Sequence, residues 1–129
     1  MYYLVLLVLL AFGCSKEENS DDLFGKWTFG SCFVNGQKTA ANGELNFVEG
    51  APCSVDIWYE ILQDSIVNDT VFLQGEFDYQ VNDDLLTINL DSETLYWDRV
   101  VNTKEEQEFH FQKIIREVQF DIVFNLVRD

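Results

Sequence analysis

The sequence predicts an all-β domain, an antiparallel up-and-down barrel of about eight strands, with a β-sandwich as the alternative. From Phe24 onward, apolar and polar residues alternate with a period of two, and short polar turns interrupt the alternation at even spacing. The chain has one proline and 15% aromatic residues, a composition typical of small barrels and sandwiches. We favour the barrel because closure hides the strand edges that would otherwise associate with other chains.

The first strand is expected in "KWTFGSCFV", with three aromatic residues on one face. These residues are Trp27, Phe29 and Phe33. Asn35-Gly36 follows as the strongest hairpin signal, because both residues tolerate a positive φ. Residues 39–46 are compatible with a short turn of helix.

The later strands repeat the same alternation. In "SVDIWYEI" the inner face is Val55, Ile57, Tyr59 and Ile61. Further strands are expected in "EFDYQV", "LLTINL", "TLYWDRVV" and "EFHFQKI", and turns at 82–84 and 102–104 separate some of them. The last strand, "VQFDIVFNLVRD", has five apolar residues on one face: Val118, Phe120, Ile122, Phe124 and Leu126. We therefore assign residues 23–129 to one barrel domain.

The N-terminal segment has the pattern of an export signal. Every residue from 4 to 12 is apolar. This run is shorter than the roughly 20 residues that span a bilayer, and it fits the apolar region of a signal peptide. "LLAFGC" resembles the lipobox of bacterial lipoproteins, in which Gly13 precedes the cysteine. The resemblance implies that residues 1–13 are removed and that Cys14 carries the lipid. The alternative is an N-terminal core strand or helix with an ordinary buried cysteine, and no Lys or Arg precedes the apolar run.

Residues 14–22 are expected to form a lipidated, disordered tether. "CSKEENSDD" contains no apolar residue after the cysteine, so too little surface can be buried to offset chain entropy. Lys16, Glu17 and Glu18 resemble the export signal of surface lipoproteins in the Bacteroidota. That resemblance implies an outer-membrane location, with the domain on the cell surface. A solvated linker without a sorting role is the alternative.

The charge of the chain limits its partners. The formal net charge is -15, and removal of residues 1–13 removes no charged side chain. Nucleic acids require a basic surface, so we expect no nucleic-acid partner. Anionic lipid headgroups are equally unfavourable for the folded domain, which leaves the lipid on Cys14 as the expected membrane contact. Solubility of an exposed domain explains the charge most simply. The oligomeric state has no signature here.

"LFGKWTFGS" resembles the opening strand of a lipocalin, in which a Gly-x-Trp motif closes one end of the barrel. Gly25 and Trp27 match the motif. The resemblance implies that Arg128, near the end of the last strand, lies across the Trp27 ring as a cation–π contact. "PCSVDIWYEI" resembles a Cys-x-x-Asp strand in the short lipocalin-like domains of Bacteroidota lipoproteins. These resemblances imply a small apolar ligand inside the barrel.

Catalysis and cofactor binding have little support in the sequence. His110 is the only histidine, and no G-x-S-x-G nucleophile elbow accompanies it. We therefore expect no enzyme, no catalytic residue, no metal and no cofactor. Two cysteines remain beside Cys14, and an exported protein favours a disulfide between Cys32 and Cys53. Two buried free thiols are the alternative.

Two classes of function remain for the domain. The first is a lipid-anchored barrel that binds a small apolar ligand, and the second is a surface interaction or structural domain with a filled core. The orientation of Trp58, Tyr96 and Trp97 separates them, because aromatic residues that face inward beside a carboxylate favour a pocket. An interior of Phe, Ile, Leu and Val alone favours the filled core.

Overall fold

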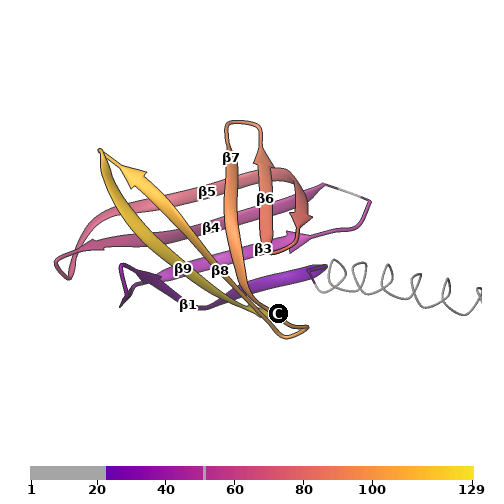
Figure 1. Ribbon diagram of the computed structural model, residues 1–129, viewed down its shortest axis with the longest axis horizontal. Helices are drawn as coiled ribbons and strands as arrows, with labels where there is room; N and C mark the ends of the chain where they lie inside the picture. Colours follow the sequence, from indigo (N-terminus) through magenta and orange to yellow (C-terminus); the bar gives the residue numbers. More distant parts are fainter. Residues whose placement is uncertain (1–22, 51) are drawn as a thin grey trace, which may run out of the picture.

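The computed structural model describes residues 23–50 and 52–129 (Figure 1). The predicted signal peptide (1–13), Cys14 and the tether (14–22) lie outside these residues. Nine strands make up the described chain. They are β1 (Gly25–Val34), β2 (Gln37–Lys38), β3 (Ala41–Phe47), β4 (Cys53–Gln63), β5 (Ile66–Asn82), β6 (Leu85–Leu90), β7 (Thr94–Asn102), β8 (Glu106–Ile115) and β9 (Val118–Arg128). Among the described residues, no helix is long and apolar enough to cross a membrane.

Eight of these strands close into an antiparallel barrel. Hydrogen-bonded neighbours follow one another from β1 through β3 to β9, and β9 pairs back with β1. β2 is an additional short strand at the outer end of β1. The fold class predicted from the alternation is therefore confirmed. Residues 39–46 do not form the short helical turn, because β3 occupies most of the segment and pairs with both β1 and β4.

The core contains the inward residues of this alternation. On β4 the four predicted inner residues are all buried, and on β9 four of the five are buried, with Val118 exposed at the hairpin end. The buried aromatic side chains are Trp27, Phe47, Tyr59, Phe77, Trp97, Phe109, Phe120 and Phe124. They come from seven of the nine strands, so the hydrophobic core lies inside the barrel.

The face assignment in β1 is wrong beyond Phe29. A β-bulge shifts the register between β1 and β9, so that Phe29 pairs with Leu126 and Ser31 with Asn125. A shift of one residue moves every later side chain to the other face. Cys32 is therefore buried, whereas Phe33 is only half-buried.

In three of the hairpins, the two strands are joined by a two-residue turn in which both residues have a positive φ. Asn35 and Gly36 have φ values of 48° and 81°, as the sequence predicts for a hairpin turn of this type. Asp64 and Ser65 connect β4 to β5, and 116–117 connects β8 to β9, in the same conformation. These latter turns contain no glycine, so no hairpin signal comparable to Asn35-Gly36 marks them.

The predicted disulfide between Cys32 and Cys53 is not formed. Both cysteines are buried free thiols. Cys53 lies one residue beyond the Asn46–Ser54 pair, across from Phe47 on β3. Phe47 in turn pairs with Gly25 at the start of β1. Cys32 lies seven residues further along β1, roughly 23 Å away at about 3.3 Å per residue, whereas a disulfide requires Cα atoms within about 7 Å. The Cys53 Sγ instead lies 3.4 Å from the Val48 amide nitrogen, which donates to it.

Candidate functional site

The first and last strands meet at a closed end of the barrel, around Trp27. The Trp27 side chain is fully buried, and its indole N–H donates to the Leu23 carbonyl at 2.8 Å. The Arg128 guanidinium carbon lies 4.3 Å from the centroid of the Trp27 ring, the arrangement that the lipocalin resemblance implies. The same guanidinium donates hydrogen bonds to the carbonyls of Phe24 and Lys104. Arg128 thus holds together three separate segments of chain over the indole.

Gly25 is required at this end for two reasons. Its φ is 119°, a conformation that side chains rarely adopt. A Cβ placed on Gly25 would also collide with the guanidinium nitrogen Nη1 of Arg128. The close approach of Arg128 to the backbone therefore depends on the missing side chain.

A buried polar cluster is a feature of the interior that the sequence reasoning missed. Arg99 and Gln107 are both buried, and the Arg99 Nε donates to the Gln107 Oε1 at 2.9 Å. Asn102 accepts from both side chains, at 2.7 Å from Arg99 and 2.6 Å from Gln107. The signal was present in the alternation, because Arg99 has the same parity as Trp97 on β7. This cluster joins the ends of β7 and β8 and provides no open surface for a ligand.

The wall of the barrel is incomplete between β5 and β8. β5 pairs with β4 from Ile66 to Phe77, but it pairs with β6 only from Phe77 onward. The ladder between β7 and β8 extends only from the Asp98–His110 pair to the Asn102–Gln107 pair. In Figure 1 the β4–β5 and β8–β9 hairpins reach out on the same side of the molecule, and β6 and β7 stand across them. Strands of unequal length therefore leave an opening in the side of the barrel.

A cavity of about 840 Å³ lies at this opening. The side chains that line it come from β4, β5, β7, β8 and β9 and from the turn before β7. Its apolar wall includes Tyr59, Val71, Leu73, Leu95, Trp97, Phe111, Ile122 and Phe124. Its volume falls in the range of small-molecule sites in proteins, which runs from about 300 to 1,000 Å³.

Four packed rings form the aromatic part of this wall. The Trp97 ring stacks on Phe111 with centroids 5.2 Å apart, and Phe124 contacts both rings edge-on at 5.4 and 4.9 Å. Tyr59 contacts Phe124 at 5.1 Å. Because each ring is held by a neighbour, the wall is pre-formed and a ligand would meet a rigid apolar surface.

Trp58, Tyr96 and Trp97, whose orientation distinguishes a barrel with a pocket from a barrel with a filled core, lie in different places. Trp97 faces inward and lines the cavity, and Asp98 follows it on the rim. Tyr96 is exposed at the mouth of the same cavity. Trp58 is half-buried on β4, opposite Phe72, and does not line the cavity. Two of the three residues thus belong to the cavity.

A few polar groups surround the apolar wall. Burial raises the pKa of the Tyr59 hydroxyl well above its usual value, and the nearby Cys32 and Glu93 raise it further. The Tyr59 hydroxyl is therefore protonated at neutral pH and can donate a hydrogen bond. The rim carries the carboxylates of Glu93, Asp98 and Asp121, together with Lys113. The mouth is thus net acidic.

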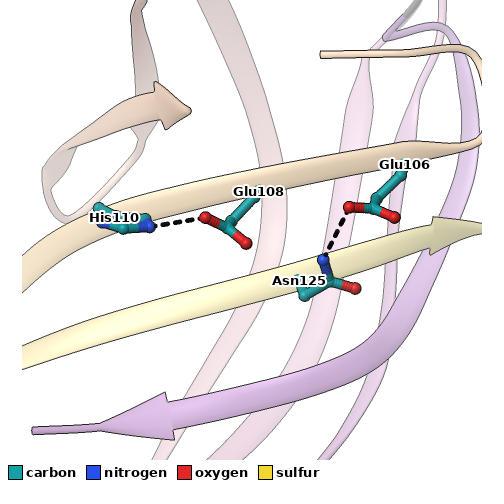
Figure 2. A network of polar contacts seen from close by, with 4 residues as sticks. All are labelled: Glu106, Glu108, His110 and Asn125. Carbon is teal, nitrogen blue, oxygen red and sulfur yellow. Dashed lines mark hydrogen bonds and ion pairs between the residues drawn. The ribbon is translucent and has the colours of Figure 1, made fainter. Parts of the chain in front are cut away.

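His110 lies at the mouth of the cavity and forms a polar pair on the outer side of β8. Its Nε2 is 2.9 Å from the Oε2 of Glu108, as Figure 2 shows, and both side chains are partly exposed. Glu106, on the same side of β8, accepts a hydrogen bond of 3.2 Å from Asn125 on β9. Within residues 23–50 and 52–129, no group of three His, Cys, Asp or Glu side chains could hold a metal ion. The contact between Glu106 and Asn125 links β8 to β9, whereas the pair of His110 and Glu108 lies within β8.

Comparison with known proteins does not assign the chain to a family. No family model matches the chain, and no curated protein matches it significantly. The fold itself has the architecture of a lipocalin-like barrel, with eight strands in a closed antiparallel ring. The geometry of the cavity is therefore the basis for a functional assignment.

Proposed function

We propose that this protein is a lipid-anchored binding protein that holds one small, mainly apolar ligand in the cavity between β5 and β8. The observation that carries the proposal is the cavity itself, about 840 Å³ with a wall of packed aromatic rings. Transfer of an apolar ligand onto such a wall contributes roughly 25 cal/mol for each Å² of apolar surface that is buried. The second function class, a filled structural domain, is disfavoured by the same cavity.

The polar rim restricts the charge of the ligand. Three carboxylates and one lysine give the rim a net charge of about -2, and the whole chain carries -15. An anionic ligand such as a fatty-acid carboxylate would be repelled from this mouth. The protonated Tyr59 hydroxyl offers a donor to a neutral oxygen atom. A neutral ligand with an ether, ester or carbonyl oxygen matches these groups best.

The anchor completes the proposal. The lipobox-like "LLAFGC" supports lipidation of Cys14, and "SKEE" after it supports display on the outer face of the outer membrane. Cys14→Ser should abolish labelling by palmitate and leave an uncleaved precursor. A Cys14→Ser protein that still labels, or that matures at the wild-type size, would refute the anchor. Replacing Lys16, Glu17 and Glu18 with alanine should keep the lipid but protect the domain from protease on whole cells.

Ligand binding is tested with a neutral apolar fluorophore, N-phenyl-1-naphthylamine. The full chain with Cys14→Ser, free of lipid, should enhance the fluorescence of the dye saturably and with one dye per chain. Val71→Trp places an indole in the cavity wall and should weaken dye binding at least tenfold. Val100→Trp, at an exposed position outside the cavity, is the matched control and should leave binding unchanged. Equal binding by both variants would mean that the dye occupies another site, and no binding by the parent chain would reject the proposal.

A further inference from the structure

The opening between β5 and β8 leaves a long strand edge without a partner. From Ile66 to Glu76, β5 has β4 as its neighbour on one side only. In this part of the described chain, no backbone–backbone hydrogen bond reaches β5 from its other side. Within this segment the Thr70 N–H already has a partner, because it donates a hydrogen bond to the Asp69 carboxylate at 2.8 Å. Since N–H and C=O groups alternate sides along a strand, about half of this segment presents free groups to the opening.

Exposed apolar side chains are concentrated along the same opening. The described residues include seven exposed large apolar side chains, and six of them belong to the unpaired part of β5, to β7 and to the end of the β8–β9 hairpin, which Arg116 brings against β5. These six are Ile66, Val67, Phe72, Tyr96, Ile114 and Val118. The seventh, Val100, lies further along β7, on the ladder with β8. A cluster of this kind around an unpaired edge is typical of an interaction surface.

The charge of the opening selects the partner. A second copy of this chain would bring another charge of -15 against the acidic rim, so self-association is disfavoured. The end of the opening is bridged by Arg116 and Asp69, whose side chains form an ion pair at 3.6 Å. This pair is exposed, and such pairs contribute about 0–1 kcal/mol, so a competing cation can replace it at little cost. A basic partner therefore fits best.

We propose that the opening is a docking site for an extended segment of a partner protein in which apolar and basic residues alternate. The segment adds a strand to the free edge of β5 by main-chain hydrogen bonds. Because side chains on a strand alternate, its apolar residues enter the cavity while its basic residues face the carboxylates outside. An unpaired strand edge requires backbone donors and acceptors in register, which a polypeptide has and an apolar dye or a lipid surface lacks. This goes beyond the proposed small ligand, and the two occupants should compete.

The test uses a ten-residue peptide that alternates lysine with valine, capped at both ends and fluorescently labelled. It should bind saturably to the full chain with Cys14→Ser, and hydrogen exchange of the β5 amides between 66 and 76 should slow. A peptide that alternates glutamate with valine should not bind. N-methylation of alternate residues removes the amide donors along one edge. If peptides methylated on either set of alternate residues bind as tightly as the parent peptide, strand addition is wrong.

Two variants separate docking from general charge attraction. Phe72→Lys places a positive charge on the free edge and should weaken peptide binding at least tenfold. Val100→Lys makes the same charge change at an exposed site away from the opening and should change binding less than twofold. Equal weakening by both variants would show that the peptide responds only to net charge, which overturns the proposal. The slowed β5 exchange is a readout that does not depend on either variant.

Other occupants give distinct results. A concentration-dependent dimer in sedimentation that is lost in Phe72→Lys would assign the opening to a second copy. Binding of the unlipidated chain to zwitterionic vesicles, lost in the same variant, would assign it to a membrane. Either result without peptide binding overturns this inference. Peptide binding without N-phenyl-1-naphthylamine binding would reject the small ligand but keep the docking site, and the reverse result would do the opposite.

Discussion

Truncation of Trp27 should unfold the barrel at a markedly lower temperature. The indole is fully buried, donates to the Leu23 carbonyl and lies beneath the Arg128 guanidinium. Trp→Ala substitutions in cores typically cost about 3–5 kcal/mol. For a domain of this size, each kcal/mol lowers the Tm by roughly 4 °C, so Trp27→Ala should lower it by about 12–20 °C. Thermal unfolding followed by circular dichroism measures this shift.

A double-mutant cycle isolates the contact between the ring and the guanidinium. The variants are Trp27→Leu, which keeps an apolar side chain, and Arg128→Met, which keeps a long stem without the charge. We expect a coupling free energy of about 0.5–2 kcal/mol, the range of cation–π contacts. Urea unfolding of the four proteins provides the values. Additivity within about 0.3 kcal/mol would show that the two residues stabilise the barrel independently and would refute this explanation of the closed end.

Three further predictions concern the backbone and the thiols. Gly43 has a φ of 116° and a Cβ there would meet the Asp56 carbonyl, so Gly43→Ala should cost more than about 1 kcal/mol in urea unfolding, and more than Gly36→Ala, whose Cβ would meet open space. A smaller loss of unfolding free energy for Gly43→Ala than for Gly36→Ala would contradict the close pairing of β3 with β4 at Gly43. Cys32 and Cys53 should react with iodoacetamide only after unfolding, and a native mass two protons below the reduced mass would instead indicate a disulfide. Burial raises the pKa of Cys32 from 9.0 to about 12, so the unfolded thiol ionises first and the free energy of unfolding should fall by up to about 1.4 kcal/mol per pH unit between pH 9 and 12. Cys32→Val should reduce that slope and leave the part due to Tyr59, whose pKa is also raised by burial, and an unchanged slope would assign it to other groups.

The pairing of the first and last strands and the inner faces of β4 and β9 could be predicted from the sequence. Trp27 and Arg128 fall in the first and last strands, and an up-and-down barrel must bring those strands together to close. The inner faces of β4 and β9 followed from alternation alone, since neither face is interrupted by a bulge that changes its phase. Local pattern and ring closure are therefore sufficient for the architecture, whereas the contact of Arg128 with Trp27 at the closed end was implied by the lipocalin resemblance.

The position of the cavity could not be predicted, because it depends on register between strands. β5 extends over 17 residues, whereas β6 has only 6 and pairs with the far end of β5. The hydrophobic pattern along one strand carries no information on where the adjacent strand in the sheet begins. The bulge at Gly30 is a similar case, since it reversed the faces of Cys32 and Phe33. The disulfide failed for the same reason, because the expected pair depended on compartment and count, while distance depends on register.

The indole N–H signals in a ¹H–¹⁵N correlation spectrum test the central claim most directly. Trp97 lies in the cavity wall, Trp27 lies at the closed end and Trp58 lies outside both, so the three signals report on three regions. Trp→Phe substitution of each residue assigns its signal. Titration with N-phenyl-1-naphthylamine should move the Trp97 signal to saturation at one dye per chain and leave the Trp27 signal in place. A Trp97 signal that stays fixed while the dye binds, or a Trp27 signal that moves instead, would contradict a ligand site between β5 and β8.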